Sequence, residues 1–189
     1  MKKYVLAVFL CLVLSWTNVS RLCAQQVMVK TNLLGWTATT PNLGVEIRLS
    51  EKLSLNLSGS YNAWNFKDNM ALRHELFQPE LRYWFCRVFQ KHFVGLHLHV
   101  ADYNIGDIPF LPATKDLQFR GILYGAGLSY GYQFPLSARW SLETSVGVGY
   151  AYMDYKKYVC RECAEIRSYV NRHYFGPTKV AVSLIYLIH

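Results

Sequence analysis

The sequence predicts an all-β protein, an eight-stranded antiparallel up-and-down β-barrel of the outer-membrane type. Three observations lead to this prediction. Apolar and polar residues alternate with a period of two in one segment after another. In each segment one face carries bulky apolar side chains and the other mostly small or polar ones. Short connections alternate with long ones, as in bacterial outer-membrane barrels.

The composition fits this fold class and excludes two others. The chain has 189 residues, of which 52% are hydrophobic and 15% aromatic, which is too apolar for a disordered protein. A polytopic helical membrane protein needs several apolar runs of about 20 residues. Only the N-terminus approaches such a run, so the remaining apolar residues are spread along the chain at alternate positions.

The chain opens with a segment that has the form of a secretory signal peptide. Two lysines precede an apolar core of about a dozen residues, and we expect cleavage after Ala24. A single transmembrane anchor would need a longer core. The expected domains are a signal peptide at 1–24 and a β-barrel domain at 25–189. Removal of two lysines and one arginine with the leader takes the formal net charge from +8 to +5.

The first three expected strands cover 27–34, 43–49 and 53–62. The second places Leu, Val, Ile and Leu on one face and Gly, Glu and Arg on the other. The third gives the clearest alternation, because one face reads Leu, Leu, Leu, Gly, Tyr and the other Ser, Asn, Ser, Ser, Asn. Such alternation is typical of a strand with two different surroundings.

The remaining five expected strands cover 74–85, 93–103, 121–134, 140–152 and 173–188. The first of them sets Phe, Pro, Leu, Tyr and Phe against Gln, Glu, Arg and Trp, and the second sets Val and Leu against Gly and His. The next two carry many glycines on the face opposite their Tyr, Leu and Val residues. The last one ends on alternating Val, Leu, Tyr and Ile. The total of eight is an even number, as in bacterial outer-membrane barrels.

The connections differ in expected length. Those at 50–52, 86–91 and 135–139 are short, and those at 35–42, 62–73, 104–116 and 154–172 are longer. An up-and-down barrel collects all the short ones at one end, where both termini also lie. Outer-membrane barrels have short periplasmic turns and longer outer loops. We therefore expect an exported protein in the outer membrane, with both termini periplasmic.

The nature of the two faces favours a membrane barrel. Small residues suit the interior of an eight-stranded barrel, which is just wide enough for side chains to fill, and bulky apolar ones suit lipid. Aromatic residues near the expected strand ends are typical of an aromatic girdle: Trp36, Trp64, Trp84, Trp140, Tyr152, Tyr155 and Tyr174. The alternative is a soluble, lipocalin-like ligand-binding barrel, which would turn its apolar face inward.

Several charged residues fall on the predicted inner face as a charge network. They are Glu46, Arg48, Glu80, Arg82 and Glu143, with Lys179 as a further candidate. A buried charge without a partner is very costly, so we expect salt bridges that fill the lumen. A gated small pore or a proton path is the alternative, for which the interior leaves little room.

His97 and His99 form a predicted pair in the polar lumen. A closed metal site needs three or four ligands, and the sequence supplies no further ones at a recognisable spacing. We therefore expect packed, hydrogen-bonded histidines, and no catalytic residue, metal or cofactor. The alternative is a membrane-embedded lipid-modifying enzyme, in which one of these histidines would act with Ser129 and Glu143.

Three cysteines follow the leader. Cys160 and Cys163, in the longest expected loop, are predicted to form a local disulfide, as befits an oxidising compartment. A redox pair would need a βαβ setting and a zinc site a second cysteine pair. Cys86 lies in a short turn at the opposite end, some 30 Å away along a strand of about ten residues. We expect Cys86 to be free.

Seven stretches carry a resemblance to a known family. They are 30–34, 40–46, 78–84, 124–132, 147–152, the Cys160-x-x-Cys163 pair and 174–179. Together they resemble a domain-of-unknown-function family of secreted proteins in Bacteroides-type bacteria, over nearly the whole mature chain. The resemblance implies an outer-membrane-barrel-like fold, no established activity and, for some members, a place beside fimbrial or surface-adhesin genes. The chain departs from the general outer-membrane assembly signal by ending on His189 rather than Phe.

These observations predict a small outer-membrane protein with a non-enzymatic role, structural or in support of surface assemblies through its outer loops. The expected partners are outer-membrane lipid and, from the resemblance, a surface or fimbrial protein. Nucleic acid is not an expected partner, because the mature chain is only mildly basic, has no long basic run and is exported.

Overall fold

The computed structural model describes residues 26–65, 71–106, 118–158 and 166–188. Eight strands and one short helix follow one another along the chain. Their bounds are β1 Val27–Asn32, α2 Leu33–Thr37, β2 Asn42–Arg48, β3 Leu53–Asn65, β4 Ala71–Trp84, β5 Lys91–Gly106, β6 Gln118–Pro135, β7 Trp140–Tyr158 and β8 Ile166–Leu187. Among the described residues, no helix is long and apolar enough to cross a membrane.

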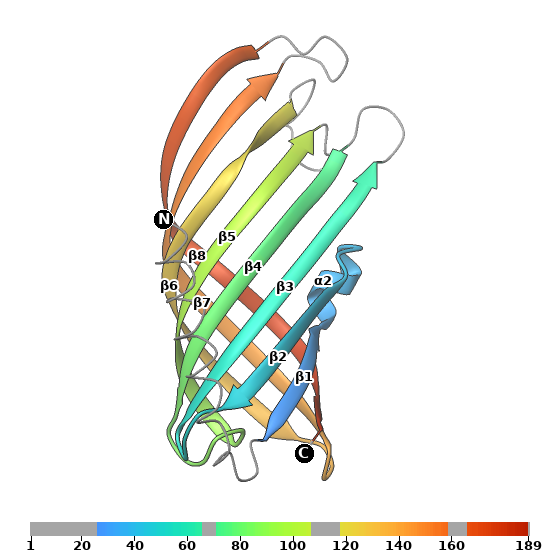
Figure 1. The fold of residues 1–189 in the computed structure, drawn as a ribbon, viewed down its shortest axis with the longest axis vertical. Helices are drawn as coiled ribbons and strands as arrows, with labels where there is room; N and C mark the ends of the chain where they lie inside the picture. The colour runs from blue at the N-terminus through green and yellow to red at the C-terminus, as the bar shows by residue number, and fades with distance from the viewer. Residues whose placement is uncertain (1–25, 66–70, 107–117, 159–165, 189) are drawn as a thin grey trace, which may run out of the picture.

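The strands form one closed antiparallel barrel in which each pairs with the next along the chain. β1 and β8 close the ring, with Val29 opposite Tyr186. The short turns lie together at one end, which is the lower end in Figure 1. Ile188 donates its backbone N–H to the Val27 carbonyl at 2.9 Å, so β1 begins and β8 ends at this short-turn end. The predicted all-β, eight-stranded up-and-down fold is confirmed.

The strands lengthen along the chain, from six residues in β1 to 22 in β8. The predicted loop at 154–172 was therefore too long, because β7 runs to Tyr158 and β8 starts at Ile166. Asp154 pairs with Asn171 inside this stretch. Both faces are partly polar here, so the alternation that marks the lower strands is weak although the backbone pairing continues.

The connections on the other side of the barrel also differ from the expectation. The predicted loop at 35–42 includes the end of α2. Between β3 and β4 only 66–70 remain outside the strands, against 85–90 between β4 and β5 at the short-turn end. The regular alternation of short and long connections is therefore lost, because the hairpins at the far end pair further than the sequence pattern indicates.

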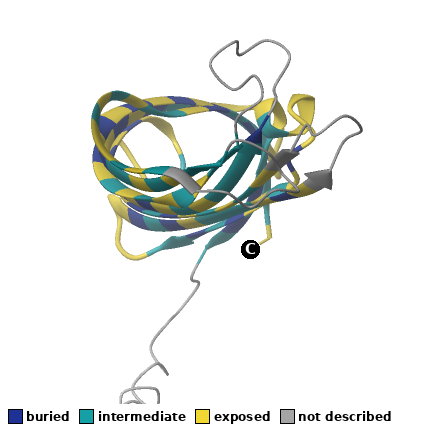
Figure 2. Ribbon diagram, turned by 90° about the horizontal axis from the view of Figure 1, so that it is seen from above, coloured by how far each residue is buried: buried dark blue, intermediate teal, exposed yellow. Residues whose placement is uncertain are grey.

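The barrel is apolar outside and polar inside. The most exposed strand residues include Leu128 at 64%, Leu43 at 60% and Phe175 at 81%. The buried ones are largely polar or charged, for example Glu46 at 0% and His97 at 0%. Figure 2, seen from above, shows buried and exposed residues alternating along the strands. This arrangement is the opposite of an apolar-lined ligand-binding barrel.

Aromatic residues lie on the outer face at two levels. At the far end are Tyr61, Phe77, Tyr124, Tyr150 and Phe175, and near the short turns are Tyr83, Phe85, Phe134 and Trp140, all exposed. His173 joins the far group, with its ring 5.2 Å from that of Tyr152. The outer surface between the two levels carries mainly Leu, Val and Tyr.

The predicted aromatic girdle was only partly right. Trp36 and Trp140 are exposed, and Tyr152 packs on Tyr124 on the outer face. Trp84, Tyr155 and Tyr174 instead lie on the inner face. Successive residues of a strand point to opposite sides, and their neighbours point outward: Phe85, Asp154 and Phe175. The side chain of Trp64 lies outside the described part of the chain.

Candidate functional site

A cluster of six charged side chains fills the middle of the barrel. Lys30, Glu46, Glu80, Arg82, Glu143 and Lys179 contribute, from β1, β2, β4, β7 and β8. Each of these side chains is at most 9% exposed. Three cations thus face three carboxylates in a space that water hardly reaches.

Arg82 is the centre of the cluster, because it contacts all three carboxylates. Its Nη1 lies 2.8 Å from a carboxylate oxygen of Glu46 and 2.8 Å from one of Glu143. Its Nη2 lies 2.7 Å from Glu80 Oε2. The planar guanidinium has five donors in a fixed fork, so one side chain ties together three strands, β2, β4 and β7.

Two lysines complete the cluster. Lys30 Nζ lies 2.5 Å from Glu46 and 3.2 Å from Glu143, and Lys179 Nζ lies 2.7 Å from Glu80. A buried ion pair is stable only when its partners and hydrogen bonds are complete. The cluster has as many cations as carboxylates, so each charge has an opposite partner.

Neutral side chains complete the hydrogen bonds of the carboxylates. Ser54 Oγ donates to Glu46 at 2.5 Å and itself accepts from Trp84 Nε1 at 2.8 Å. Ser129 Oγ donates to Glu80. The space is tight, because a Cβ on Gly95 would lie 2.5 Å from a Glu80 oxygen and 2.5 Å from Ser129 Oγ. An alanine at position 95 would therefore have to displace the ends of these two side chains.

An apolar layer closes the barrel between the cluster and the short turns. Trp84, Val88 and Phe93 are buried and pack with Phe89. The Arg82 guanidinium lies over the Phe93 ring, 4.2 Å from its centroid, which is a cation–π contact. The cluster and this layer together fill the lower lumen.

The structure brings together four of the five residues of the predicted charge network. Glu46, Glu80, Arg82 and Glu143 meet, and Lys179 joins them. Arg48 is the exception and corrects the prediction. It lies at the last position of β2, where Nε donates to the Ser50 carbonyl at 3.1 Å. This position lies on the inner face of β2 but at the rim of the barrel, so the guanidinium is half-exposed.

Sequence reasoning missed Lys30, although it lies on the inner face of a predicted strand. In the structure, Lys30 aligns in register with Gly44 and sits two positions from the buried Met28. The alternation in β1 is short and less regular than elsewhere, so its inner face could not be assigned from the pattern alone.

His97 and His99 lie on the inner face of β5, and both are buried. Their rings are 5.6 Å apart, and His97 Nε2 lies 2.9 Å from Thr178 Oγ1. A β-bulge in the β7–β8 pairing lies beside Thr178. Among the described residues, no group of three or more His, Cys, Asp or Glu side chains could hold a metal ion.

The residues of the enzyme alternative point to other partners. Ser129 donates to Glu80, and Glu143 accepts from Arg82 and Lys30. Glu143 therefore belongs to the ion cluster, and Ser129 is hydrogen-bonded to it.

The cysteines fall into two groups. Cys160 and Cys163 lie outside the described residues, so their predicted disulfide stays a prediction. Cys86 lies in the connection between β4 and β5, exposed and free.

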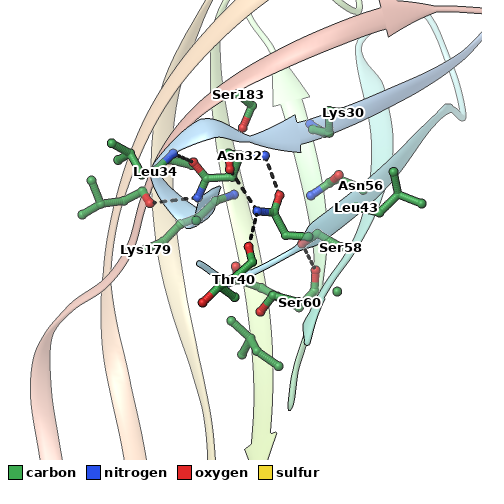
Figure 3. Close-up of a pocket in the computed structure, with 18 of the residues that line it drawn as sticks. Lys30, Asn32, Leu34, Thr40, Leu43, Asn56, Ser58, Ser60, Lys179 and Ser183 are labelled. Carbon is green, nitrogen blue, oxygen red and sulfur yellow. Dashed lines mark hydrogen bonds between the residues drawn. The ribbon is translucent and has the colours of Figure 1, made fainter. Parts of the chain in front are cut away.

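Two asparagines hold the far ends of β1 and β2, and sequence reasoning gave them no role beyond the family resemblance. Asn32 Oδ1 accepts from Leu34 N at 3.1 Å, which caps α2, and from Val182 N of β8 at 3.1 Å. Asn42 Nδ2 donates to the Asn32 carbonyl at 2.9 Å, and Asn42 Oδ1 accepts from Asn32 N at 2.5 Å. In Figure 3, Asn32 and Leu34 lie close together. The two amides replace backbone pairing where the chain leaves the barrel wall to form α2.

A cavity of about 380 Å³ lies between the ion cluster and this asparagine pair. Residues of β1, α2, β2, β3, β4, β7 and β8 line it. Its walls include Thr40, Asn42, Asn56, Ser58 and Ser183 (Figure 3). The upper lumen is therefore open and polar, in contrast to the filled lower lumen.

The comparisons with known proteins give a family and no function. No curated protein matches the chain. Over residues 7–188, nearly its whole length, the chain matches the family described as "Protein of unknown function (DUF3575)". The chain, which folds as an eight-stranded β-barrel, therefore belongs to the DUF3575 family.

Proposed function

We propose that this protein is a small outer-membrane barrel with a closed lumen, which serves as a scaffold for its outer loops. The observation that carries the proposal is the inverted polarity of the barrel. Bulky apolar side chains cover the outside, as in Leu96, Leu98 and Leu128, all exposed by 54% or more. Soluble barrels bury such residues, whereas membrane barrels turn them to lipid.

The height of the apolar surface supports the same proposal. Tyr124 and Phe134, one from each aromatic level, lie ten positions apart in β6. Ten residues at about 3.3 Å span about 33 Å along the strand, which is about 25 Å of height at the usual tilt of roughly 40°. The apolar band of outer-membrane barrels is about 25 Å tall between its aromatic girdles.

The orientation follows from the two ends of the barrel. Short turns lie at the end where β1 begins and β8 ends. In outer-membrane barrels this end is periplasmic, so the long far ends of β5 to β8 would face the exterior. The leader at 1–24 would direct export, and both termini would be periplasmic.

The filled lower lumen supports a scaffold rather than a pore. Arg82 with its three carboxylate partners, and Trp84 with Phe93 below it, occupy the space that a channel would need. The loops at the far end would then carry the specific contacts. Their partner would be a surface protein, which agrees with the resemblance to secreted proteins encoded near fimbrial genes.

The test compares two leucines that are almost equally exposed but lie at different levels along the barrel axis. Leu128 is 64% exposed in the middle of the apolar band, and Leu136 is 62% exposed in a short turn. In lipid, Leu128→Arg is expected to destabilise the folded barrel by about 2–4 kcal/mol, and Leu136→Arg by about 0–1 kcal/mol. In water both substitutions would be nearly neutral.

The measurement is urea unfolding in lipid vesicles, together with recovery of each variant in the outer-membrane fraction. Wild type should migrate as a heat-modifiable band from that fraction, with Leu128→Arg depleted and Leu136→Arg retained. Equal behaviour of the two variants, or recovery of the wild type as a soluble periplasmic monomer, would refute the proposal.

A further inference from the structure

The cavity above the ion cluster exposes only part of that cluster. Four of the six cluster residues line the cavity, namely Lys30, Arg82, Glu143 and Lys179. Glu46 and Glu80 are absent from the lining. The cluster as a whole has three cations and three carboxylates, whereas the lining of the cavity has three cations and one carboxylate. Cations therefore outnumber carboxylates at its floor, while Glu46 and Glu80 pair with them behind the lining.

The two lysines have donors to spare for a bound anion. An ammonium group carries three N–H donors. Among the described residues, Lys179 Nζ has one carboxylate partner, Glu80 at 2.7 Å, and Lys30 Nζ has two, Glu46 and Glu143. Two donors of Lys179 and one of Lys30 therefore remain for an acceptor in the cavity. Arg82 directs its donors to carboxylates, so it adds charge rather than a free donor.

Asn56 adds an acceptor to the same wall. Its side chain is 2% exposed, and its Nδ2 donates to Glu80 at 3.4 Å. Its Oδ1 has no hydrogen-bond partner among the described residues. Exchanging the amide oxygen and nitrogen would place the oxygen against the Glu80 carboxylate, so the orientation is set. A buried carbonyl oxygen without a donor is costly, and it calls for a ligand that also donates.

We propose that this cavity binds a phosphate monoester as its monoanion, the form that keeps one O–H. Its negative oxygens would accept from Lys179 and Lys30, and its O–H would donate to Asn56 Oδ1. An ionised carboxylate only accepts hydrogen bonds, and so does the phosphate dianion that prevails above pH about 6. Either would leave Asn56 Oδ1 without a donor. Hydroxyls of Ser58, Ser60 and Ser183 on the surrounding walls suit the polar remainder of such a ligand (Figure 3).

The wall of the barrel is low beside this cavity. β1 pairs with β8 only as far as Asn32 opposite Ser183, and β2 pairs with β3 only as far as Asn42 opposite Ser60. β3 and β8 continue beyond these points, and α2 stands between them (Figure 1). The exposed apolar residues Leu34, Leu43 and Val180 also line the cavity. A phosphate could therefore arrive from solution or as the headgroup of a lipid.

The experiment measures binding to the folded protein in phosphate-free micelles of a neutral detergent, at pH about 5, below the second phosphate pKa of about 6. Glycerol 3-phosphate tests the free source and phosphatidic acid the lipid source, by calorimetry and native mass spectrometry respectively. Glycerol and phosphatidylcholine are the matched neutral and zwitterionic controls. Binding of both phosphate probes, or of phosphatidic acid alone, supports the site and names its source. Binding of neither above its control overturns the proposal.

The variants test which residues hold the phosphate. Lys179→Gln should weaken binding roughly tenfold or more, as expected for a charge-assisted hydrogen bond. Lys156→Gln removes the same charge from an exposed position outside the cavity and should leave binding unchanged. Equal losses in the two variants would show a general charge effect and overturn the site.

A second variant keeps the test valid if Lys179→Gln does not fold. Asn56→Ala leaves every charge in place and should weaken the binding of glycerol 3-phosphate roughly threefold or more, because the ligand O–H loses its acceptor. Unchanged binding in Asn56→Ala would overturn the role of the amide. Because the binding is measured on folded protein in micelles, its result is independent of where the barrel resides.

Discussion

The lower and upper halves of this barrel use the same wall in different ways. Below, the cluster around Arg82 and the apolar layer of Trp84 and Phe93 fill the lumen, and each buried charge has an opposite partner. Above, β1 and β2 stop, a cavity of about 380 Å³ opens, and the long strands β5 to β8 continue. The lower half thus resembles the core of a globular domain, and the upper half resembles a binding surface.

This difference indicates which part of a small barrel stabilises the fold and which part is available for function. An eight-stranded barrel has room for one layer of side chains in its interior. Where those side chains are large and mutually paired, the layer stabilises the fold. Where they are small and carry hydroxyls, such as Ser58, Ser60 and Ser183, space remains for a ligand. Substitutions below should therefore reduce stability more than substitutions above.

The largest expected effect is that of Arg82→Met. The substitution leaves three buried carboxylates with two lysines, and removing one partner of a buried ion pair costs about 3–5 kcal/mol. Arg48→Met is the matched control, because Arg48 is half-exposed and donates to the Ser50 carbonyl and to Gln26. It should cost less than about 1 kcal/mol. Urea unfolding followed by tryptophan fluorescence in micelles measures both, and equal losses would contradict the contrast between core and rim.

The next effect compares two glycines on opposite faces. A Cβ on Gly127 would lie 2.7 Å from the His97 ring and 2.6 Å from the Val148 carbonyl. Gly127→Ala should therefore destabilise the barrel by about 1–3 kcal/mol, the usual cost of overpacking. A Cβ on Gly59 would have its nearest neighbour, the Leu76 carbonyl, at 3.7 Å.

Gly59→Ala should accordingly be neutral or should stabilise the barrel by up to about 1 kcal/mol, because alanine restricts the unfolded chain. The same unfolding assay in micelles compares the two variants. A tolerated Gly127→Ala would mean that the histidines at this level are not packed as tightly as the distances indicate.

Much of the lower barrel could be predicted from the sequence, because each strand there separates two unlike surroundings. In 53–62 every outward residue is apolar or glycine and every inward one is Ser or Asn, so the two faces can be read directly. The same alternation places Glu80 and Arg82 on the inner face. Their pairing follows from the cost of a buried unpaired charge.

The upper barrel could be predicted less well for a physical reason. Near Asp154 and Asn171 both faces are partly polar, and β-pairing there depends on backbone hydrogen bonds that leave little trace in the side-chain pattern. The inward position of Trp84 shows a related limit. Aromatic residues suit both an interfacial girdle and a packed interior. The aromatic side chain of Trp84 suggested the girdle, whereas its position two residues after Arg82, on the same face of the strand, indicated the lumen.

The third prediction concerns the boundary between the two halves. Asn32→Ala removes the cap of α2 and the acceptor for Val182 N, and should cost about 1–2 kcal/mol. Asn32→Asp keeps the acceptor oxygen and loses only the weak donation to the Val180 carbonyl at 3.5 Å, so it should recover most of the loss. Urea unfolding in micelles distinguishes the two. If aspartate does no better than alanine, the oxygen is not what holds this boundary.

The smallest expected effect lies at the far end of the long strands. Lys156 Nζ lies 5.1 Å from the centroid of the Tyr169 ring, across the β7–β8 pair. Such an exposed cation–π contact contributes about 0.5–1 kcal/mol at most, so Lys156→Gln should hardly change the urea midpoint in micelles. The upper hairpin is then a region that tolerates change without loss of the fold, as a surface for specific contacts requires. A loss as large as that of Arg82→Met would instead mean that the β7–β8 extension helps to hold the barrel closed, and the division between a stabilising lower half and a functional upper half would fail.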